Sequence, residues 1–449
     1  MTVMRRRRNI QIIVSALGLL TLGFLYILWL QRHDDPLYAR LAALLSVGLF
    51  AALGLRFVPR WIAFWSKENS APAPAEEPPY MGLRLFLALL LADGCLLLAA
   101  WLVRRLLGHE ESLLASLRFW RVADGVHYLD IARDWYLSEG SVDRLVQLVF
   151  LPGYPLLVRL LIPLTRSDLA AGLFVSALCF AGAGSALYRL LRLDLPHVAA
   201  LRGVLLLCLL PGSFFFAAPM SESLFLLLCV LCLYLARTGR WFFACLCGAM
   251  AAFTRSLGLT LLAPLVMELV HAAVNGALPR RRLLPRALSL LLVPAGFGVY
   301  CYVNNLVAGD PFQFLIYQSE HWSQHLGLFF NTAAYQTQLA ASSFGRDAPL
   351  FWGLWLPNLL TAFGALAVMI LAAGRLRASY TAWFIAYFVI AVGATWLLSA
   401  PRYLMATPML PAALALLTER KGLRLAAFLV LAPAWVLYFL AFLARWQVW

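Results

Sequence analysis

The chain has 449 residues, of which 63% are hydrophobic and 13% are charged, and its mean hydropathy is +0.81. A soluble domain has about half apolar and about a quarter charged residues, so these values exclude a soluble protein and predict one that crosses a membrane many times. The formal charge of +15 reflects 36 lysine and arginine residues against 21 acidic ones. Because the basic residues lie between apolar runs, they indicate topology control and contacts with membrane lipids, and we expect no nucleic-acid partner.

The N-terminal region predicts a hairpin of two transmembrane helices and a linker. Arg5–Arg8 precede the first apolar run, so we expect a cytoplasmic N-terminus. A second apolar run, 41–58, is followed by SAPAPAEEPP at 70–79, whose prolines and acids are typical of a short linker. We therefore expect residues 1–80 to be an appended hairpin with a Pro-rich linker, and residues 81–449 to be the main transmembrane domain.

A charged and aromatic segment follows the third apolar run. Residues 118–136, RFWRVADGVHYLDIARDWY, hold Asp124, His127 and Asp130, which we expect to line one side of a helix. Ionised carboxylates are costly in hydrocarbon, so they must face water, headgroups or a polar cavity. Residues 104–168 carry as many acidic residues as arginines, which fits a folded external loop. A solvated helix with internal ion pairs is the alternative.

The next apolar segment, VFLPGYPLLVRLLIPL at 149–164, is short and interrupted by prolines and Arg159. We expect it to lie in the interface or to re-enter the membrane, because counting it as a span would invert every later loop. Further spans are expected at about 169–190, 198–217, 221–236, 241–256, 257–274, 287–307, 350–373, 380–399, 403–418 and 425–443. The expected total is about 13 transmembrane helices.

Every other polar motif then emerges on the face that carries Asp124. These motifs are PMSES at 219–223, FTRS at 253–256, a long loop at 308–349 and SAPRY at 399–403. A single external active site would have this layout.

Within these motifs, Glu222 follows Ser221, a candidate N-cap, at a helix start where the dipole favours a carboxylate. Glu222 is therefore either a polar contributor to a cleft or a plain capping residue. Arg255 and Arg402 lie at helix mouths on the outer face, so each guanidinium needs an external anion, for which phosphate is the obvious candidate. Headgroup binding at the interface is the alternative for both arginines.

The sequence contains few signs of a cofactor. His321 and His325 stand four residues apart and could bind a divalent metal on a helix, but their segment lacks the catalytic Glu of a zinc protease, and we assign no metal ligand. The eight cysteines lie in or beside apolar runs and are interpreted as packing residues. No nucleotide-binding or hydrolase motif is present in the sequence.

Taken in chain order, the motifs resemble the PIG-V family of mannosyltransferases, members of the GT-C class that uses polyprenyl-phosphate sugars. The similar stretches are ADGVHYLDIARDWY with VFLPGYPLLVRLL, PGSFFFAAPMSESLFLLL, AFTRSLGLTLL, GDPFQFLIYQSEHW and APRYLMATPML. The family typically opens its first motif with a W-D pair that is followed, after two residues, by His. Here Ala123 stands in place of the Trp, while Asp124 and His127 remain.

The resemblance implies a GT-C-like bundle whose folded external first loop is catalytic. It implies that Asp124 is the catalytic carboxylate, and we place His127 beside it to orient the carboxylate or a substrate phosphate. An inverting transfer needs one general base, and a phosphate leaving group needs cations rather than a general acid. The remaining expected site residues bind substrate: Arg121, Tyr128, Tyr154, Glu222, Arg255, Glu320, Trp322, Arg402 and Tyr403.

We therefore predict an integral-membrane glycosyltransferase that transfers a hexose, expected to be mannose, from a polyprenyl-phosphate carrier. The acceptor would be a glycan, a lipid or a protein on the extracytoplasmic face of a bacterial plasma membrane, or of the ER membrane if the protein is eukaryotic. A transporter or flippase of lipid-linked sugars is one alternative, although it should distribute polar groups across the membrane's depth. A non-catalytic assembly subunit, in which Asp124 would be dispensable, is another.

Overall fold

The computed structural model describes residues 2–65, 78–276 and 278–449. Within these ranges the regular elements are helical, and the only β-type pairing is a bridge between Leu326 and Ala394. The predicted all-α class is therefore confirmed.

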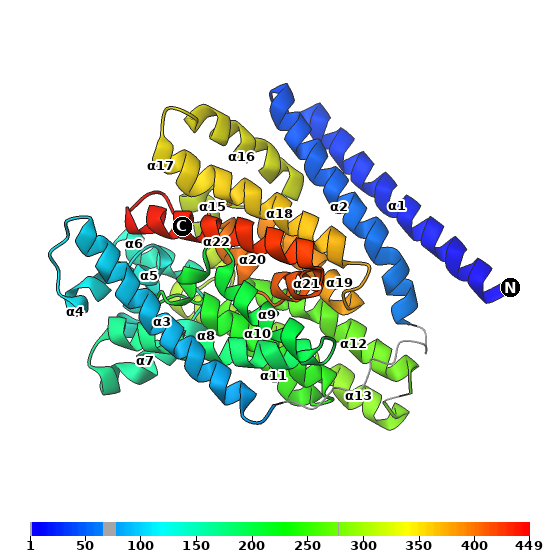
Figure 1. Ribbon diagram of the computed structural model, residues 1–449, viewed down its shortest axis with the longest axis horizontal. Helices are drawn as coiled ribbons and strands as arrows, with labels where there is room; N and C mark the ends of the chain where they lie inside the picture. The colour runs from blue at the N-terminus through cyan, green and yellow to red at the C-terminus, as the bar shows by residue number, and fades with distance from the viewer. Residues whose placement is uncertain (1, 66–77, 277) are drawn as a thin grey trace.

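The first half of the described chain forms the N-terminal hairpin, a third long helix, a group of short helices and the central helices. These elements are α1 (Thr2–Arg32), α2 (Leu37–Phe64), α3 (Met81–Leu106), α4 (Leu113–Ser116), η1 (Leu117–Trp120), α5 (Asp124–Asp134), α6 (Val142–Leu145), η2 (Val146–Val149), α7 (Gly153–Thr165), α8 (Asp168–Arg192), α9 (His197–Leu209) and η3 (Ser213–Phe216). Figure 1 shows α4–α7 gathered at one end of the molecule.

The second half completes the bundle. It contains α10 (Glu222–Arg237), α11 (Trp241–Thr254), η4 (Ser256–Leu261), α12 (Leu262–Val274), α13 (Arg280–Ser289), α14 (Leu292–Ala308), α15 (Gln313–Trp322), α16 (Phe329–Ser343), α17 (Ala348–Leu350), η5 (Phe351–Trp355), α18 (Leu356–Ala372), α19 (Ala378–Val392), α20 (Ala400–Met405), α21 (Met409–Leu417) and α22 (Lys421–Leu443).

Among the described residues, eight helices are long and apolar enough to cross a membrane. A ninth span results if Val142–Val149 and Gly153–Thr165, which are bent by 113° at their junction, count as one broken span; a re-entrant loop is the other reading of this pair. The expected count of about 13 is not shown. Helices α9, α11 and α19 have 13, 14 and 15 residues, so they are about 20–22 Å long and shorter than a hydrocarbon core of about 30 Å.

Interruptions of helices explain why hydropathy predicted more spans than the described part of the structure contains. The expected span at 403–418 is divided between α20 and α21, and the expected span at 198–217 ends as an α-helix at Leu209 before the 3-10 turn η3. Pro211 and Pro408 stand at these breaks. Proline removes a backbone donor and clashes with the preceding helical turn, so the helix ends there. The apolar composition continues past that point, which is why hydropathy alone predicts a single uninterrupted span.

Helix α8 lies at the centre of the bundle and packs against α3, α7, α9 and α10. Small residues allow these close approaches. A Cβ atom added at Gly172 would lie 2.7 Å from the Pro219 side chain and 2.9 Å from Leu129. Gly172 therefore brings the PMSES segment and α5 together against α8.

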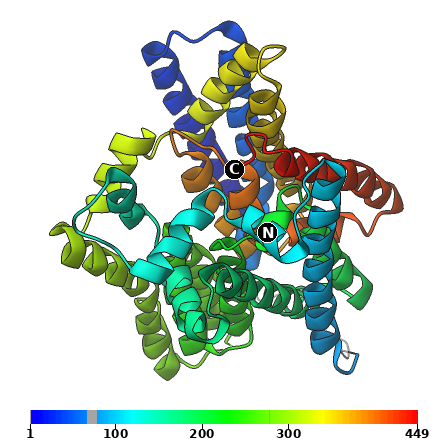
Figure 2. The same ribbon diagram turned by 90° about the vertical axis from the view of Figure 1, so that its left-hand side faces the viewer.

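The N-terminal hairpin is docked on the rest of the molecule rather than standing apart. Helices α1 and α2 lie side by side at one edge, and α16 packs against α2 (Figures 1 and 2). The Trp29 indole donates a hydrogen bond of 2.8 Å to Asn331 Oδ1, and the rings of Phe50 and Phe329 are 4.5 Å apart. Much of the segment 308–349, which we expected to be a loop, is therefore a packing surface for the hairpin.

Candidate active site

Four charged side chains from four separate segments meet in the interior, and we call them the charged quartet: Asp124, Glu222, Arg255 and Arg402. Asp124 begins α5, Glu222 begins α10, Arg255 joins α11 to η4, and Arg402 lies in α20. The structure thus brings together residues from four of the motifs that the sequence singled out. Two carboxylates and two guanidiniums make the quartet neutral overall.

Asp124 is the member of the quartet that reaches the surface, and Arg402 holds it there. The Arg402 Nη2 atom donates to Asp124 Oδ2 at 2.7 Å and to Ser399 Oγ at 2.9 Å. The Arg402 side chain is 3% exposed, whereas that of Asp124 is 34% exposed. A buried guanidinium requires partners to offset the loss of hydration, and of the charged partners of Arg402 Asp124 is the one that substrate could still reach.

Glu222 holds the two arginines close to each other. Its Oε1 atom lies 2.8 Å from Nη1 of Arg255 and 3.6 Å from Nη1 of Arg402, so these two nitrogens cannot be farther apart than the sum of those distances. The Glu222 side chain is 1% exposed. Its Oε2 atom is buried and has no hydrogen-bond partner in the described part of the chain. Glu222 therefore offsets the repulsion between two like charges in one small volume.

Neutral side chains complete the surroundings of Arg255. Its Nη1 atom donates to Ser221 Oγ at 3.1 Å, and its guanidinium lies 4.9 Å from the centre of the Tyr403 ring. Ser221 also exchanges a hydrogen bond of 2.9 Å with the Tyr128 hydroxyl. Ser221 does occupy the N-cap position of α10, but its side chain makes no capping bond. Its hydroxyl instead joins Tyr128 of α5 to Arg255.

The electrostatics of Asp124 follow from its neighbours. Burial alone would raise the pKa of Asp124, but the charge and hydrogen bond of Arg402, with a further contribution from Arg255, hold this pKa below its ordinary value. Asp124 is therefore ionised at neutral pH. Ala123, immediately before it, has a φ of 47°, in a region that L residues rarely adopt. Such backbone strain is concentrated at functional sites.

Tyr154 supports the quartet from α7. Its hydroxyl donates to the backbone oxygen of Gly172 at 2.8 Å and shares a hydrogen bond of 2.9 Å with Ser176 Oγ. Its ring meets the Tyr128 ring edge-on, with centroids 5.5 Å apart. Because the Tyr154 side chain is fully buried, it lies beneath Tyr128 rather than at a surface that substrate could touch.

Three other predicted site residues lie around Phe150 or beyond it. The His127 ring stacks on the Phe150 ring at 4.7 Å, and the Trp322 ring meets Phe150 edge-on at 6.4 Å. Glu320 is exposed near the end of α15, and in the described ranges no hydrogen bond or ion pair joins it to the quartet. Phe150 thus lies between His127 of α5 and Trp322 of α15.

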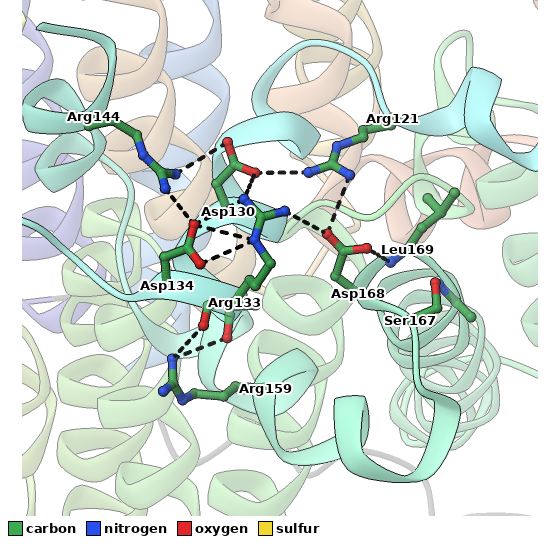
Figure 3. A network of polar contacts seen from close by, with 11 residues as sticks. Arg121, Asp130, Arg133, Asp134, Arg144, Arg159, Ser167, Asp168 and Leu169 are labelled. Atoms are coloured by element: carbon green, nitrogen blue, oxygen red, sulfur yellow. Dashed lines mark hydrogen bonds and ion pairs between the residues drawn. The ribbon is translucent and has the colours of Figure 1, made fainter. Parts of the chain in front are cut away.

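Arg121 lies outside the quartet, in a separate ion network that Figure 3 shows. It contacts Asp130 at 2.8 Å and Asp168 at 3.3 Å. Arg133 and Arg144 also contact Asp130, at 3.1 and 3.5 Å. Since Asp168 begins α8, the network fixes α5 to the end of the central helix.

Asp124 and Asp130 therefore point to different clusters, although we expected them to line one side of a helix. Six residues at 3.6 per turn make about 1.7 turns, which leaves the two side chains about 120° apart around the helix axis, so the two carboxylates leave α5 in different directions. Asp124 reaches Arg402, and Asp130 reaches the network of arginines. The two acids consequently have different surroundings and should differ in function.

The ion network should weaken in acid. Hydrogen bonds from Arg133 and Arg144 lower the pKa of Asp134 from 3.8 to about 2. A lowered pKa contributes stability that is present above the unfolded value and is lost as pH falls through the folded value, here between about 4 and about 2. Amide hydrogen exchange in α5 and α6, corrected for intrinsic rates, should accelerate across that window. An Asp134→Asn variant should exchange faster already at pH 5, and equal protection in both proteins would contradict the assignment.

Sequence reasoning missed several neutral members of the site. Ser221 and Ser399 hydrogen-bond the two arginines of the quartet, and both stand inside motifs that had been noted for their charged residues. Phe150 received no attention because an aromatic residue in an apolar run is usually a packing residue. No group of three or more His, Cys, Asp or Glu side chains in the described ranges could hold a metal ion.

The chain is similar to known proteins in sequence and in structure. A family model described as "Mannosyltransferase (PIG-V)" matches residues 87–321, a range that contains three members of the quartet. GPI mannosyltransferase 2 of Drosophila pseudoobscura pseudoobscura is 33% identical over 127 residues, which are 26% of this chain and 27% of that protein. The match to this curated relative thus spans about a quarter of its length.

Among solved structures, the chain is similar to the archaeal oligosaccharyltransferase AglB from Archaeoglobus fulgidus, solved with an inhibitory peptide and a dolichol-phosphate. The similarity covers 82% of this chain and 56% of that one, with a TM-score of 0.43 and 14% sequence identity.

Proposed function

The chain belongs to the PIG-V family of mannosyltransferases, and we propose that it transfers mannose from a polyprenyl-phosphate carrier to an acceptor hydroxyl. The observation that supports this most directly is the charged quartet, in which two guanidiniums lie beside one partly exposed carboxylate. Glycosyl transfer from a phosphate carrier needs those two elements, because cations must stabilise the departing phosphate and a base must accept the proton of the acceptor.

In the proposed reaction, the acceptor oxygen attacks the anomeric carbon while Asp124 takes the hydroxyl proton. The bond between that carbon and the phosphate oxygen breaks, and polyprenyl phosphate leaves with the electron pair. One displacement at the anomeric carbon inverts its configuration. Asp124 suits the role of base because its Oδ2 atom is held by Arg402 and the side chain remains 34% exposed.

Arg255 and Arg402 would bind the donor phosphate. Both are held by Glu222, which allows two guanidiniums to reach one phosphate group. Arg402 would then divide its hydrogen bonds between the phosphate and Asp124. As Arg402 turns toward the phosphate, the pKa of Asp124 should rise from its lowered value, and Asp124 should become a stronger base.

The remaining site residues have supporting roles in this proposal. Tyr128 is joined to Arg255 through Ser221, and the ring of Tyr403 lies against the Arg255 guanidinium. Tyr154 packs beneath Tyr128. His127 and Trp322, on either side of Phe150, would contact the sugar or the acceptor. Arg121 and Glu320, which lie apart from the quartet, would contact more distant parts of a substrate.

We also propose that the quartet opens to the extracytoplasmic side and that the N-terminus is cytoplasmic. The arginine-rich segments near Arg281 and Arg375 would then lie inside, as the positive-inside rule requires. In a cysteine-free background, single cysteines at Glu139 and Glu320 should react with a membrane-impermeant thiol reagent in intact cells. Cysteines at Arg281 and Gly374 should react only after permeabilisation, and the reverse pattern would invert the topology.

The proposed activity is tested with purified protein in nanodiscs, supplied with radiolabelled polyprenyl-phosphate mannose and a lipid extract as the source of acceptor. Label should move from the donor into an acid-stable product. Mass spectrometry of lipids that copurify with the protein should detect polyprenyl phosphate. If no product forms and the same protein in sealed proteoliposomes moves the labelled donor across the bilayer unchanged, the protein is a transporter of lipid-linked sugars.

A further inference from the structure

A second polar site lies at the other end of the molecule from the charged quartet. A cavity of about 240 Å³ is lined by residues that include Arg60, Asp194, His271, Arg375, Arg377 and Ala378. Asp194 follows the C-terminal end of α8, whereas Asp168 at its N-terminal end joins the ion network of α5. The 25 residues of α8 separate these two ends by about 37 Å. In Figure 1 the C-terminal end of α2, which bears Arg60, lies opposite α4–α7.

The carboxylate that lines this cavity, and those that contact its arginines, already have arginine partners. Arg377 makes two hydrogen bonds to Glu268, at 2.6 and 2.7 Å, and Arg375 contacts Glu419 at 2.5 Å. Asp194 pairs with Arg237. In the described part of the chain, Arg60 has no carboxylate partner. Among the residues that the structure describes, the positive charge of Arg60 is therefore not compensated.

The hydrogen-bonding state of Arg60 also indicates a missing acceptor. Its Nη2 atom lies 3.5 Å from the backbone oxygen of Arg375, at the limit of a hydrogen bond. Its Nε atom is buried and has no partner among the described residues. A buried donor without an acceptor is unfavourable, and an oxygen-rich anion in the cavity would supply the missing acceptor.

The backbone adds to this preference for an anion. Helix α19 has 15 residues and begins at Ala378, which lines the cavity. The first N–H groups of a helix lack intrahelical acceptors and carry partial positive charge, so they favour an anion at the helix start. The volume is below the ~300–1,000 Å³ that is usual for a complete drug-sized ligand, which fits a headgroup-sized molecule.

We propose that this cavity binds a phosphate group, either as the headgroup of an anionic phospholipid or as a free phosphate anion. The ligand would join Arg60 of the N-terminal hairpin to Arg375 and α19 of the main bundle. In the orientation proposed above, the site lies at the cytoplasmic leaflet, where anionic lipids attract basic pockets between helices. Its occupancy does not depend on the proposed sugar transfer, because none of its residues belongs to the quartet.

The test measures thermal unfolding of the full-length protein after delipidation in a neutral detergent. Short-chain phosphatidylglycerol should raise the unfolding midpoint in a saturable manner, and phosphatidylcholine should not. Sodium phosphate is compared with sodium chloride at equal ionic strength. Arg60→Gln should weaken the apparent affinity for the stabilising anion at least tenfold. Arg281→Gln, a matched change at an exposed arginine that does not line the cavity, should leave it unchanged.

The source of the phosphate follows from which anion acts. If only phosphatidylglycerol raises the unfolding midpoint, the ligand is a lipid headgroup. If sodium phosphate raises it too, the site also accepts a free phosphate anion. If wild-type protein responds to neither, or if Arg60→Gln responds like wild type, the site does not exist as proposed. Should Arg60→Gln fail to fold, Arg375→Gln must show the same tenfold loss. Polyprenyl-phosphate binding at the quartet, measured in parallel, should be unaffected.

Discussion

Replacing Asp124 with Asn should reduce mannose transfer at least about 10²-fold, the lower end of what a positioned general base contributes. Asn keeps the shape of Asp and most of its hydrogen bonding, but it cannot accept a proton usefully near neutral pH. Donor binding should be as tight as in wild type or tighter, because the carboxylate no longer competes with phosphate for Arg402. Transfer from labelled donor and equilibrium binding of polyprenyl phosphate measure the two effects separately.

Two other acids provide the controls for this variant. Asp130→Asn removes a carboxylate of the same helix that contacts arginines outside the quartet, so it should destabilise α5 without a comparable loss of transfer. Glu222→Gln should weaken donor binding, because Glu222 holds the two arginines together. If Asp124→Asn turns over like wild type while either control abolishes transfer, the base is misassigned. If none of the three matters, the transporter becomes the better hypothesis.

The members of the quartet could be predicted from sequence because ionised groups in apolar surroundings are costly and therefore conspicuous. Asp124, Glu222, Arg255 and Arg402 each stand out against long apolar runs. Their pairing could not be predicted, because it depends on how α5, α10 and α20 are placed around α8. The separation of Asp124 from Asp130 shows this, since only the rotation of α5 decides which cluster each acid joins.

Other features depend on packing that leaves little trace in sequence. Ser221 sits where an N-cap is expected, yet its hydroxyl contacts Tyr128 and Arg255, which are far away in the chain. The helix α16 was expected to be part of a loop because its composition is mixed, but its aromatic residues pack on the hairpin. In both cases a tertiary contact overrides a local preference.

Replacing Arg402 with Ala should weaken binding of polyprenyl phosphate by about 1.5–3 kcal/mol, as expected for one charge-assisted hydrogen bond. Arg402→Lys should recover part of this loss, since Lys supplies the charge but not the two-pronged geometry of a guanidinium. Arg402 is buried and paired with Asp124, so the Ala variant should also be less stable. Thermal unfolding of each variant therefore has to accompany the binding measurement.

A purely structural arginine can be distinguished from a phosphate ligand by the choice of lipid. Wild-type protein should bind polyprenyl phosphate much more tightly than the uncharged polyprenol, because only the former offers an anion to the quartet. Arg402→Ala and Arg255→Ala should each lose much of this preference while keeping their affinity for polyprenol, since the apolar contacts with the tail are unchanged. Loss of stability alone would lower both affinities together. If both Ala variants keep the wild-type preference for phosphate, these arginines stabilise the fold and do not bind the leaving group.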